Sequence, residues 1–183
     1  MTPTRINRRR FLLTAGGALG ASALACGGLA ALATRKPEID LAESTYGEAD
    51  SMSGRILVAY ASTHGSTAGV ADAIGKALAQ DGVAVDVRCV KEVEDLASYR
   101  AVVAGSAIYG NAWLPEALEF VQAHQAELQR VPTALFLVCG TLANSPEQRD
   151  TVAEWLQPVR SLVPPVAEGR FAGQILPIML KSR

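Results

Sequence analysis

Short apolar segments alternate with helical patterns along most of this chain, and that alternation constrains the fold more than any other feature. Buried strands are expected at residues 55–60, 101–105 and 133–139, with further strands at 83–87 and 166–171. Helices are expected between them, at 67–80, 115–127 and 146–163. Strands that alternate with helices form a parallel sheet covered on both faces, and continuous apolar strands are typical of such sheets. The sequence therefore predicts a doubly wound α/β domain with about five parallel strands.

Residues 1–33 have the pattern of a targeting segment. Four arginines (Arg5, Arg8, Arg9 and Arg10) precede an uncharged stretch, Phe11–Ala33, that is rich in alanine and glycine. A basic region followed by an apolar region and small residues defines a secretory signal, and the arginines resemble a twin-arginine (Tat) signal. The alternative is a retained anchor, because the stretch is long enough to cross a bilayer. We expect an exported, extracytoplasmic or membrane-anchored protein, with residues 11–33 as its membrane-associated segment.

The domain itself is expected at residues 54–183. Residues 34–53 predict a polar linker, because they contain several acids and show no hydrophobic period. The composition, 49% hydrophobic and 19% charged, suits a packed core, and the net charge of −1 gives no reason to expect nucleic-acid binding. Residues 175–180 are mostly apolar and no helix follows them. The closing helix of a doubly wound sheet is therefore missing from the pattern, and either truncation or a covering partner or membrane would explain this.

Cys89 and Cys139 lie on separate expected strands. Two cysteines alone do not make a metal site, and we expect no metal. An export signal would permit a disulfide. We expect free thiols, because the strand order that a family resemblance implies, given below, does not place these two strands side by side.

Hydroxyl side chains crowd the segment that joins the first strand to its helix. This segment consists of Ser62, Thr63, His64, Gly65, Ser66 and Thr67. A helix that begins here presents free N–H groups and the positive end of its dipole, and the hydroxyls add uncharged donors, which together suit a phosphate. The segment is neither a Walker loop nor a dinucleotide fingerprint, because the required Gly-Lys and G-x-G-x-x-G spacings are missing. The alternative is a helix N-cap with spare hydroxyls.

Two further loops follow the other buried strands, and open parallel sheets bind ligands at that edge. The second loop carries two aromatic rings among small residues, which suits stacking on a flat heteroaromatic ligand or, alternatively, covers the edge of the core. Its candidate residues are Ser106, Ala107, Ile108, Tyr109, Gly110, Asn111 and Trp113. In the third loop, Gly140 would let the backbone approach a ligand closely. Asn144 and Ser145 are equally explained as the cap of the next helix.

These loops carry a resemblance to a known family. Residues 62–67 resemble the flavodoxin phosphate loop, which holds the FMN phosphate without a basic side chain, and residues 105–110 resemble the loop beside the isoalloxazine ring. By pattern the chain is most similar to flavodoxin-domain proteins of the menaquinone-dependent protoporphyrinogen IX dehydrogenase type. Their second loop also ends in Tyr-Gly, and their last strand also ends near Phe-Ala-Gly, here Phe171–Gly173. The resemblance covers about residues 54–177.

The resemblance implies a five-stranded sheet in the order 2-1-3-4-5, a bound FMN and a role for each loop. Residues 62–67 would grip the phosphate, and residues 106–111 with Tyr109 or Trp113 would line the ring. Backbone groups of Cys139, Gly140 and Thr141 would face the pyrimidine side. No catalytic side chain is implied, because the flavin carries the chemistry. The third loop departs from the dehydrogenases, since residues 144–147 stand where those proteins carry basic residues.

We therefore expect an FMN-binding, flavodoxin-like oxidoreductase or electron-transfer protein, with protoporphyrinogen dehydrogenase-like activity as the finer form of this hypothesis. Its electron partner would be a quinone or a redox protein. The alternative is an exported binding or structural domain that keeps the fold but has lost FMN and activity.

Overall fold

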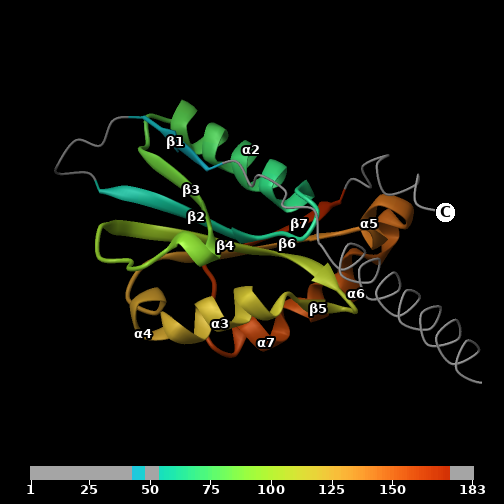
Figure 1. Ribbon diagram of the computed structural model, residues 1–183. Coiled ribbons are helices and arrows are strands. Elements are labelled where there is room, and N and C mark those ends of the chain that lie inside the picture. Colours follow the sequence, from blue (N-terminus) through green and yellow to red (C-terminus); the bar gives the residue numbers. More distant parts are fainter. Residues whose placement is uncertain (1–42, 48–53, 174–183) are drawn as a thin grey trace, which may run out of the picture. The chain divides into compact units, whose positions relative to one another are not determined.

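The computed structural model describes residues 43–47 and 54–173, and these form a layered α/β/α arrangement around a seven-stranded sheet (Figure 1). Five strands run parallel: β2 (Arg55–Ala61), β3 (Val85–Cys89), β4 (Tyr99–Tyr109), β6 (Thr133–Cys139) and β7 (Ala167–Ala172). In space they lie in the order β3-β2-β4-β6-β7. Numbered along the chain, this order is 2-1-3-4-5, so the predicted fold class and strand order are confirmed.

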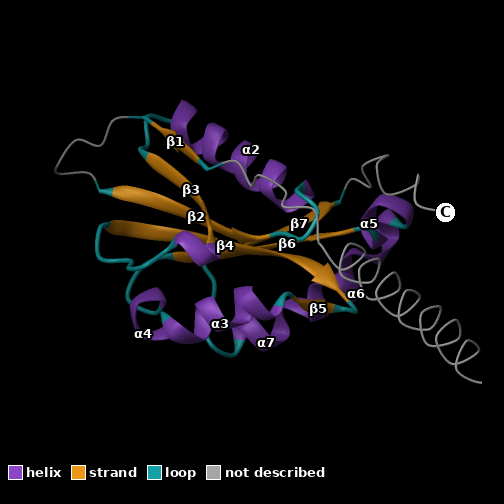
Figure 2. Cartoon of the chain, viewed as in Figure 1, coloured by secondary structure: helices purple, strands orange, loops and turns teal. Residues whose placement is uncertain are grey.

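The helix α2 (Ser66–Gln80) covers one face of the sheet, as Figure 2 shows. The buried residues beneath it include Val58, Tyr60 and Val87. A side chain at Gly75 would place its Cβ 2.5 Å from Val87 Cγ2, so glycine at this position lets the helix approach the sheet closely. The predicted helix at 67–80 is thus confirmed, with one more residue at its start.

The opposite face of the sheet is covered by α3 (Pro115–Ala123), α4 (Gln125–Leu128) and α7 (Gln157–Arg160) (Figure 1). The long helix expected at 146–163 is instead a series of short pieces. These are η2 (Pro146–Gln148), α6 (Arg149–Ala153), η3 (Glu154–Leu156) and α7. Pro158 lies in the first turn of α7, and a proline has no N–H to continue a preceding helix.

The predicted linker at 34–53 is wrong for residues 44–46. These form β1 (Ser44–Tyr46), which pairs antiparallel with β3 at the edge of the sheet. The Thr45 hydroxyl donates to Asp86 Oδ1 at 2.8 Å, and Arg55 donates to the same carboxylate at 2.6 and 2.8 Å. A three-residue strand is too short to show a period of two, so only its partners reveal it.

The remaining expectations concern the cysteines and the two ends of the chain. Cys89 and Cys139 are free and buried, as predicted. The targeting segment at 1–33 and the apolar residues 175–180 lie outside the described residues. Among the helices that are described, none has the length and apolar character needed to cross a membrane.

Candidate functional site

The first loop turns sharply between β2 and α2. Gly65 is the N-cap of the helix and has a φ of 84°, a left-handed conformation that favours glycine. Its backbone N–H donates to Ser62 Oγ at 3.0 Å, which closes the turn. Thr63 Oγ1 lies 2.8 Å from His64 Nδ1. The N-cap is a glycine and has no side chain, so none of the hydroxyls of this loop is the N-cap side chain of α2.

Thr67 lies in the first turn of α2 and is fully buried, with 0% of its surface exposed. Its Oγ1 has no hydrogen-bond partner within the part of the chain that the structure describes. Buried hydroxyls are nearly always paired, because an unpaired one loses its hydration without compensation. The free N–H groups of the same turn attract anions. An anionic ligand that reached this turn would supply the partner that Thr67 lacks, although Thr67 itself does not line the cavity described below.

The second loop is a hairpin. The strand β4 was expected to end at Gly105 but continues to Tyr109, and it pairs there with β5 (Ala112–Trp113). Gly110 and Asn111, between the two strands, have φ values of 59° and 65°. Positive φ at both central residues is the requirement of a type I′ hairpin turn. This explains the identity of both residues and leaves Tyr109 at the tip, 78% exposed.

Two predicted residues of this loop lie in the interior. Ser106 is buried, and its Oγ donates to the Ala107 carbonyl at 2.7 Å and accepts from the Leu114 N–H at 3.0 Å. It therefore fixes the base of the hairpin. Trp113 is only 4% exposed and belongs to the core on the α3 face. Of the two interpretations of this ring, the structure supports coverage of the core.

The three loops converge on a small cavity of about 140 Å³. Its lining consists of Ser62, Thr63, His64 and Ser66 from the first loop and the start of α2; Ala107, Ile108 and Tyr109 from β4; Val138, Cys139 and Gly140 at the end of β6; and Gly173 after β7. The predicted residues that do not line it are Gly65, Thr67, Ser106, Gly110, Asn111, Trp113 and Thr141. Because ligand pockets usually measure about 300–1,000 Å³, the cavity encloses only part of a nucleotide-sized ligand.

Sequence reasoning missed Val138 and Gly173. Gly173 follows the fifth parallel strand, and its N–H donates to the Cys139 carbonyl at 2.8 Å. Applying the rule for strand ends to the last strand as well would have found it.

Among the described residues, no Lys, Arg, Asp or Glu lines the cavity, and the first turn of α2 contains no acid. Tyr60 lies in β2, two residues before the loop. It is buried, and its hydroxyl has no hydrogen-bond partner among the described residues. Burial raises the pKa of Tyr60 to about 12, and the neighbouring groups Cys89, Glu43 and Asp72 make smaller contributions in the same direction. The phenol therefore remains neutral and adds no negative charge beside the loop.

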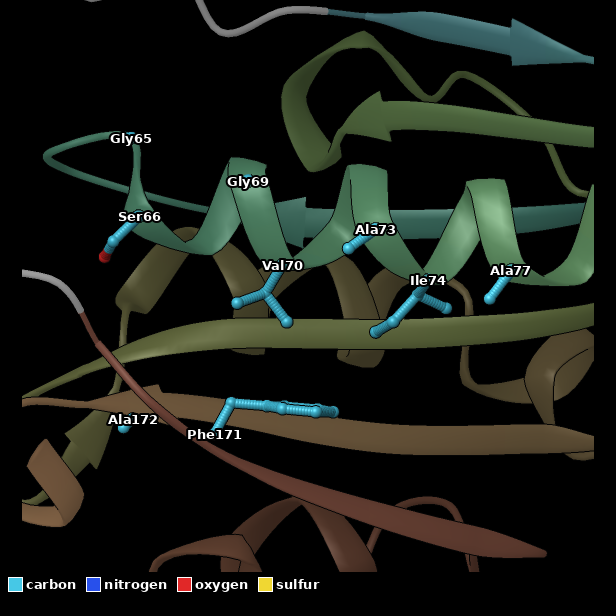
Figure 3. A pocket seen from close by; sticks show the side chains of 9 residues that line it. All are labelled: Gly65, Ser66, Gly69, Val70, Ala73, Ile74, Ala77, Phe171 and Ala172. Atoms are coloured by element: carbon cyan, nitrogen blue, oxygen red, sulfur yellow. The ribbon is translucent and has the colours of Figure 1, made fainter.

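A larger cavity of about 590 Å³ lies between α2 and β7, where Figure 3 shows Val70 and Ile74 directed from the helix toward the strand that carries Phe171. Its remaining lining residues are Gly65, Ser66, Gly69, Ala73, Ala77 and Ala172. Ser66 supplies its one polar side chain. Binding sites for polar ligands need several convergent polar groups, so the smaller cavity is the better candidate.

The comparisons with known proteins agree with this fold. A family model described as a flavodoxin domain matches residues 57–181. A flavodoxin from the domain Archaea is 22% identical, with a TM-score of 0.51 over 66% of this chain and 84% of that one. The two-electron reduced flavodoxin of Megasphaera elsdenii is 20% identical, with a TM-score of 0.52 over 66% of this chain and 88% of that one. No curated protein sequence matches the chain. The extent of the family match, over more than half of the sequence, decides the assignment: the chain belongs to the flavodoxin-domain family.

Proposed function

We propose that this domain binds FMN and serves as an electron-transfer protein or oxidoreductase. The observation that carries the proposal is Thr67, a buried hydroxyl without a described partner in the first turn of a helix that begins at the ligand-binding edge of the sheet. Membership of the flavodoxin-domain family and the aromatic side chain of Tyr109 at the same cavity support it.

Each group of residues would have a distinct task toward the cofactor. The N–H groups at the start of α2 and the hydroxyls of Thr63, Ser66 and Thr67 would hold the phosphate, because all are uncharged donors around a helix N-terminus. Tyr109 would stack on the flat ring, and the backbone at Cys139 and Gly140 would offer polar groups to its edge. Bound FMN would supply one- and two-electron transfer, and the protein's own residues would orient it and exclude water from one side.

The finer hypothesis is a dehydrogenase of the protoporphyrinogen type that delivers electrons to a quinone. It rests on the second loop and on Phe171–Gly173, whereas residues 144–147 lack the basic character of those enzymes. Reduction of a quinone by the flavin-loaded protein at a membrane would support it. Reaction with soluble redox proteins alone would favour an electron shuttle.

We also propose that residues 1–33 export the protein. N-terminal sequencing of the mature protein, with fractionation of cells into membrane and extracytoplasmic pools, distinguishes a cleaved signal from a retained anchor. A full-length chain found only in the cytoplasm would contradict export.

The test of FMN binding is a titration of the full chain followed by flavin fluorescence. We expect a yellow holoprotein, and we expect Thr63→Val combined with Thr67→Val to weaken binding about a hundredfold or more, because hydrogen bonds to charged groups contribute about 1.5–3 kcal/mol each. Thr133→Val is the matched control, since this buried threonine is bonded to the Leu128 carbonyl. A folded protein that ignores FMN would favour the alternative, a domain that has lost the cofactor. If the double variant binds FMN with full affinity, the phosphate does not bind at this loop.

A further inference from the structure

We propose that the large apolar groove between α2 and β7 is the docking site of the segment 174–183 of the same chain, which follows β7. The groove is the cavity of about 590 Å³ that Figure 3 shows from close by. Docking of this segment would complete the fold, and it does not depend on the binding of FMN.

One helix is too narrow to cover the face of the sheet on which the groove lies. Neighbouring strands are about 4.8 Å apart, so the outer two of the five parallel strands, β3 and β7, are separated by about 19 Å. A helix with its side chains is about 10–12 Å wide. In the described part of the chain, α2 is the only helix whose residues pack on this face. About half of the width, toward β7, is therefore left for another segment.

The exposure of Phe171 shows that this half of the face is incompletely covered. Its ring packs edge to face on that of Phe136, with the ring centroids 6.1 Å apart and the planes at 79°. Phe136 is only 1% exposed, whereas Phe171 is 37% exposed. On the helix side of the groove, Ala73 and Ala77 are exposed as well. A continuous apolar surface of this kind is one that another segment or molecule covers.

The segment 174–183 has the composition that the groove requires. Half of its ten residues are large and apolar: Ile175, Leu176, Ile178, Met179 and Leu180. The groove offers the apolar side chains of Val70, Ile74 and Phe171, and no charged residue is in its lining. Docking would remove both apolar surfaces from water at once, and hydrophobic stabilisation grows with the area removed. The family match, which extends to residue 181, includes most of this segment in the domain.

The connection to β7 tethers the segment beside the groove. Phe171 and Ala172, at the end of β7, line the groove, and the N–H of the next residue, Gly173, donates to the Cys139 carbonyl at 2.8 Å. The part of α2 that lines the groove ends at Ala77 and is about 18 Å long. Ten residues span up to about 33 Å when extended and about 15 Å as a helix, so either conformation follows most of the groove. A tethered segment is present at an effective concentration of about millimolar or more, which favours it over a free partner.

Charges at the far end of the groove favour the same arrangement. A segment that starts beside the N-terminus of α2 and follows the groove would bring Lys181 and Arg183 toward the C-terminus of this helix. The last turn of α2 contains no basic residue, and Asp81, which follows it, is exposed. Positive side chains stabilise the negative end of a helix dipole, so the order of apolar and basic residues in the segment matches the direction of the groove.

The first experiment compares the same substitution at two exposed alanines in helices. Ala73 lines the groove, whereas Ala123 lies in α3, on the opposite face of the sheet. Glutamine has nearly the helix propensity of alanine. In urea unfolding of the full chain without flavin, Ala73→Gln should lower the midpoint clearly and Ala123→Gln should leave it nearly unchanged. The reason is that only the first variant would place a polar amide beneath docked apolar side chains.

A double-variant cycle connects the groove to the segment. Ile178→Gln alone should also lower the urea midpoint, because it removes an apolar side chain from the docked segment. Ala73→Gln combined with Ile178→Gln should lower the midpoint by clearly less than the sum of the two single shifts, because a segment that has left the groove no longer senses a change in it.

A measurement on the unmodified chain avoids any loss of folding. With isoleucine methyl groups labelled for NMR, nuclear Overhauser contacts should join the methyls of Ile74 to those of Ile175 or Ile178. The contacts should persist when labelled protein is diluted with unlabelled protein, because both groups belong to one chain.

Other occupants of the groove would give different results. A second copy of the chain would make the urea midpoint depend on protein concentration, and the methyl contacts would fade on dilution with unlabelled protein. A membrane would leave Ala73→Gln as stable as Ala123→Gln in solution, and vesicles of phosphatidylcholine and phosphatidylglycerol would bind the wild-type chain but not Ala73→Gln. Either result, or the absence of methyl contacts in the folded chain, would overturn the docking of the segment 174–183. The FMN titration is separate, so these outcomes leave the proposed function untouched.

Discussion

Replacing Thr67 with valine should stabilise the ligand-free protein, although it removes a hydroxyl from the proposed site. The side chain is fully buried, and its Oγ1 has no partner among the described residues. Valine has nearly the same shape, and its helix propensity is close to that of threonine. An unsatisfied buried polar group costs about 1–3 kcal/mol, so we expect the free energy of unfolding to rise by about 1 kcal/mol.

Thr133→Val provides the control of opposite sign. Thr133 is equally buried, with 2% of its surface exposed, but its Oγ1 donates to the Leu128 carbonyl at 2.9 Å. Valine there leaves the carbonyl with one partner fewer and should lower the free energy of unfolding by about 1 kcal/mol. Urea unfolding followed by circular dichroism, without flavin, measures both variants. If Thr67→Val destabilises the protein as much as Thr133→Val does, the Thr67 hydroxyl is already satisfied and the main argument for a ligand at this turn is refuted.

Three further variants test the packing and the charges of the sheet. Gly75→Ala should destabilise the protein by about 1–2 kcal/mol because the added Cβ meets Val87, whereas Gly69→Ala, with nothing within 4 Å, should stabilise it by about 0.5–1 kcal/mol; urea midpoints that move in the same direction would refute the close contact. Burial raises the pKa of Asp86, but its bonds to Arg55 and Thr45 and the nearby positive charges outweigh this and lower it. A carboxylate with a lowered pKa contributes stability that is present above its unfolded value, about 3.9, and is lost as the pH falls through its folded value. The free energy of unfolding of Asp86→Asn should therefore be about 2 kcal/mol lower than that of the wild-type protein at pH 7, and it should fall less on acidification to pH 3. If urea titrations show the same acid dependence for both proteins, the role of the Asp86 carboxylate is contradicted.

Local patterns were sufficient for the five parallel strands and for α2, but not for β1, β5 or the helix expected at 146–163. The strand at 133–139 has the bounds that its apolar run predicts, and α2 differs from prediction by one residue. The helix expected at 146–163 is divided into four pieces, and Pro158, whose effect on a helix can be read from sequence, accounts only for the break before α7. Periodicity records which side of a segment is covered, whereas the strand order was implied by the resemblance to flavodoxins. The convergence of three loops on one cavity was predictable because open parallel sheets bind ligands at the carboxyl ends of their strands.

The assignment of individual side chains needed the tertiary structure. In the second loop, Tyr109 and Trp113 are both aromatic rings next to small residues, yet one is exposed at a hairpin tip and the other is buried in the core. Among the hydroxyls of the first loop, Ser62 closes a turn while Thr67 is buried without a described partner. Hydrogen-bond partners and burial depend on residues far away in the chain, and a sequence pattern records only neighbours. The chain order of the residues was enough to locate the edge where a ligand would bind, whereas only the packed structure separates the groups that can contact a ligand from those that hold the fold.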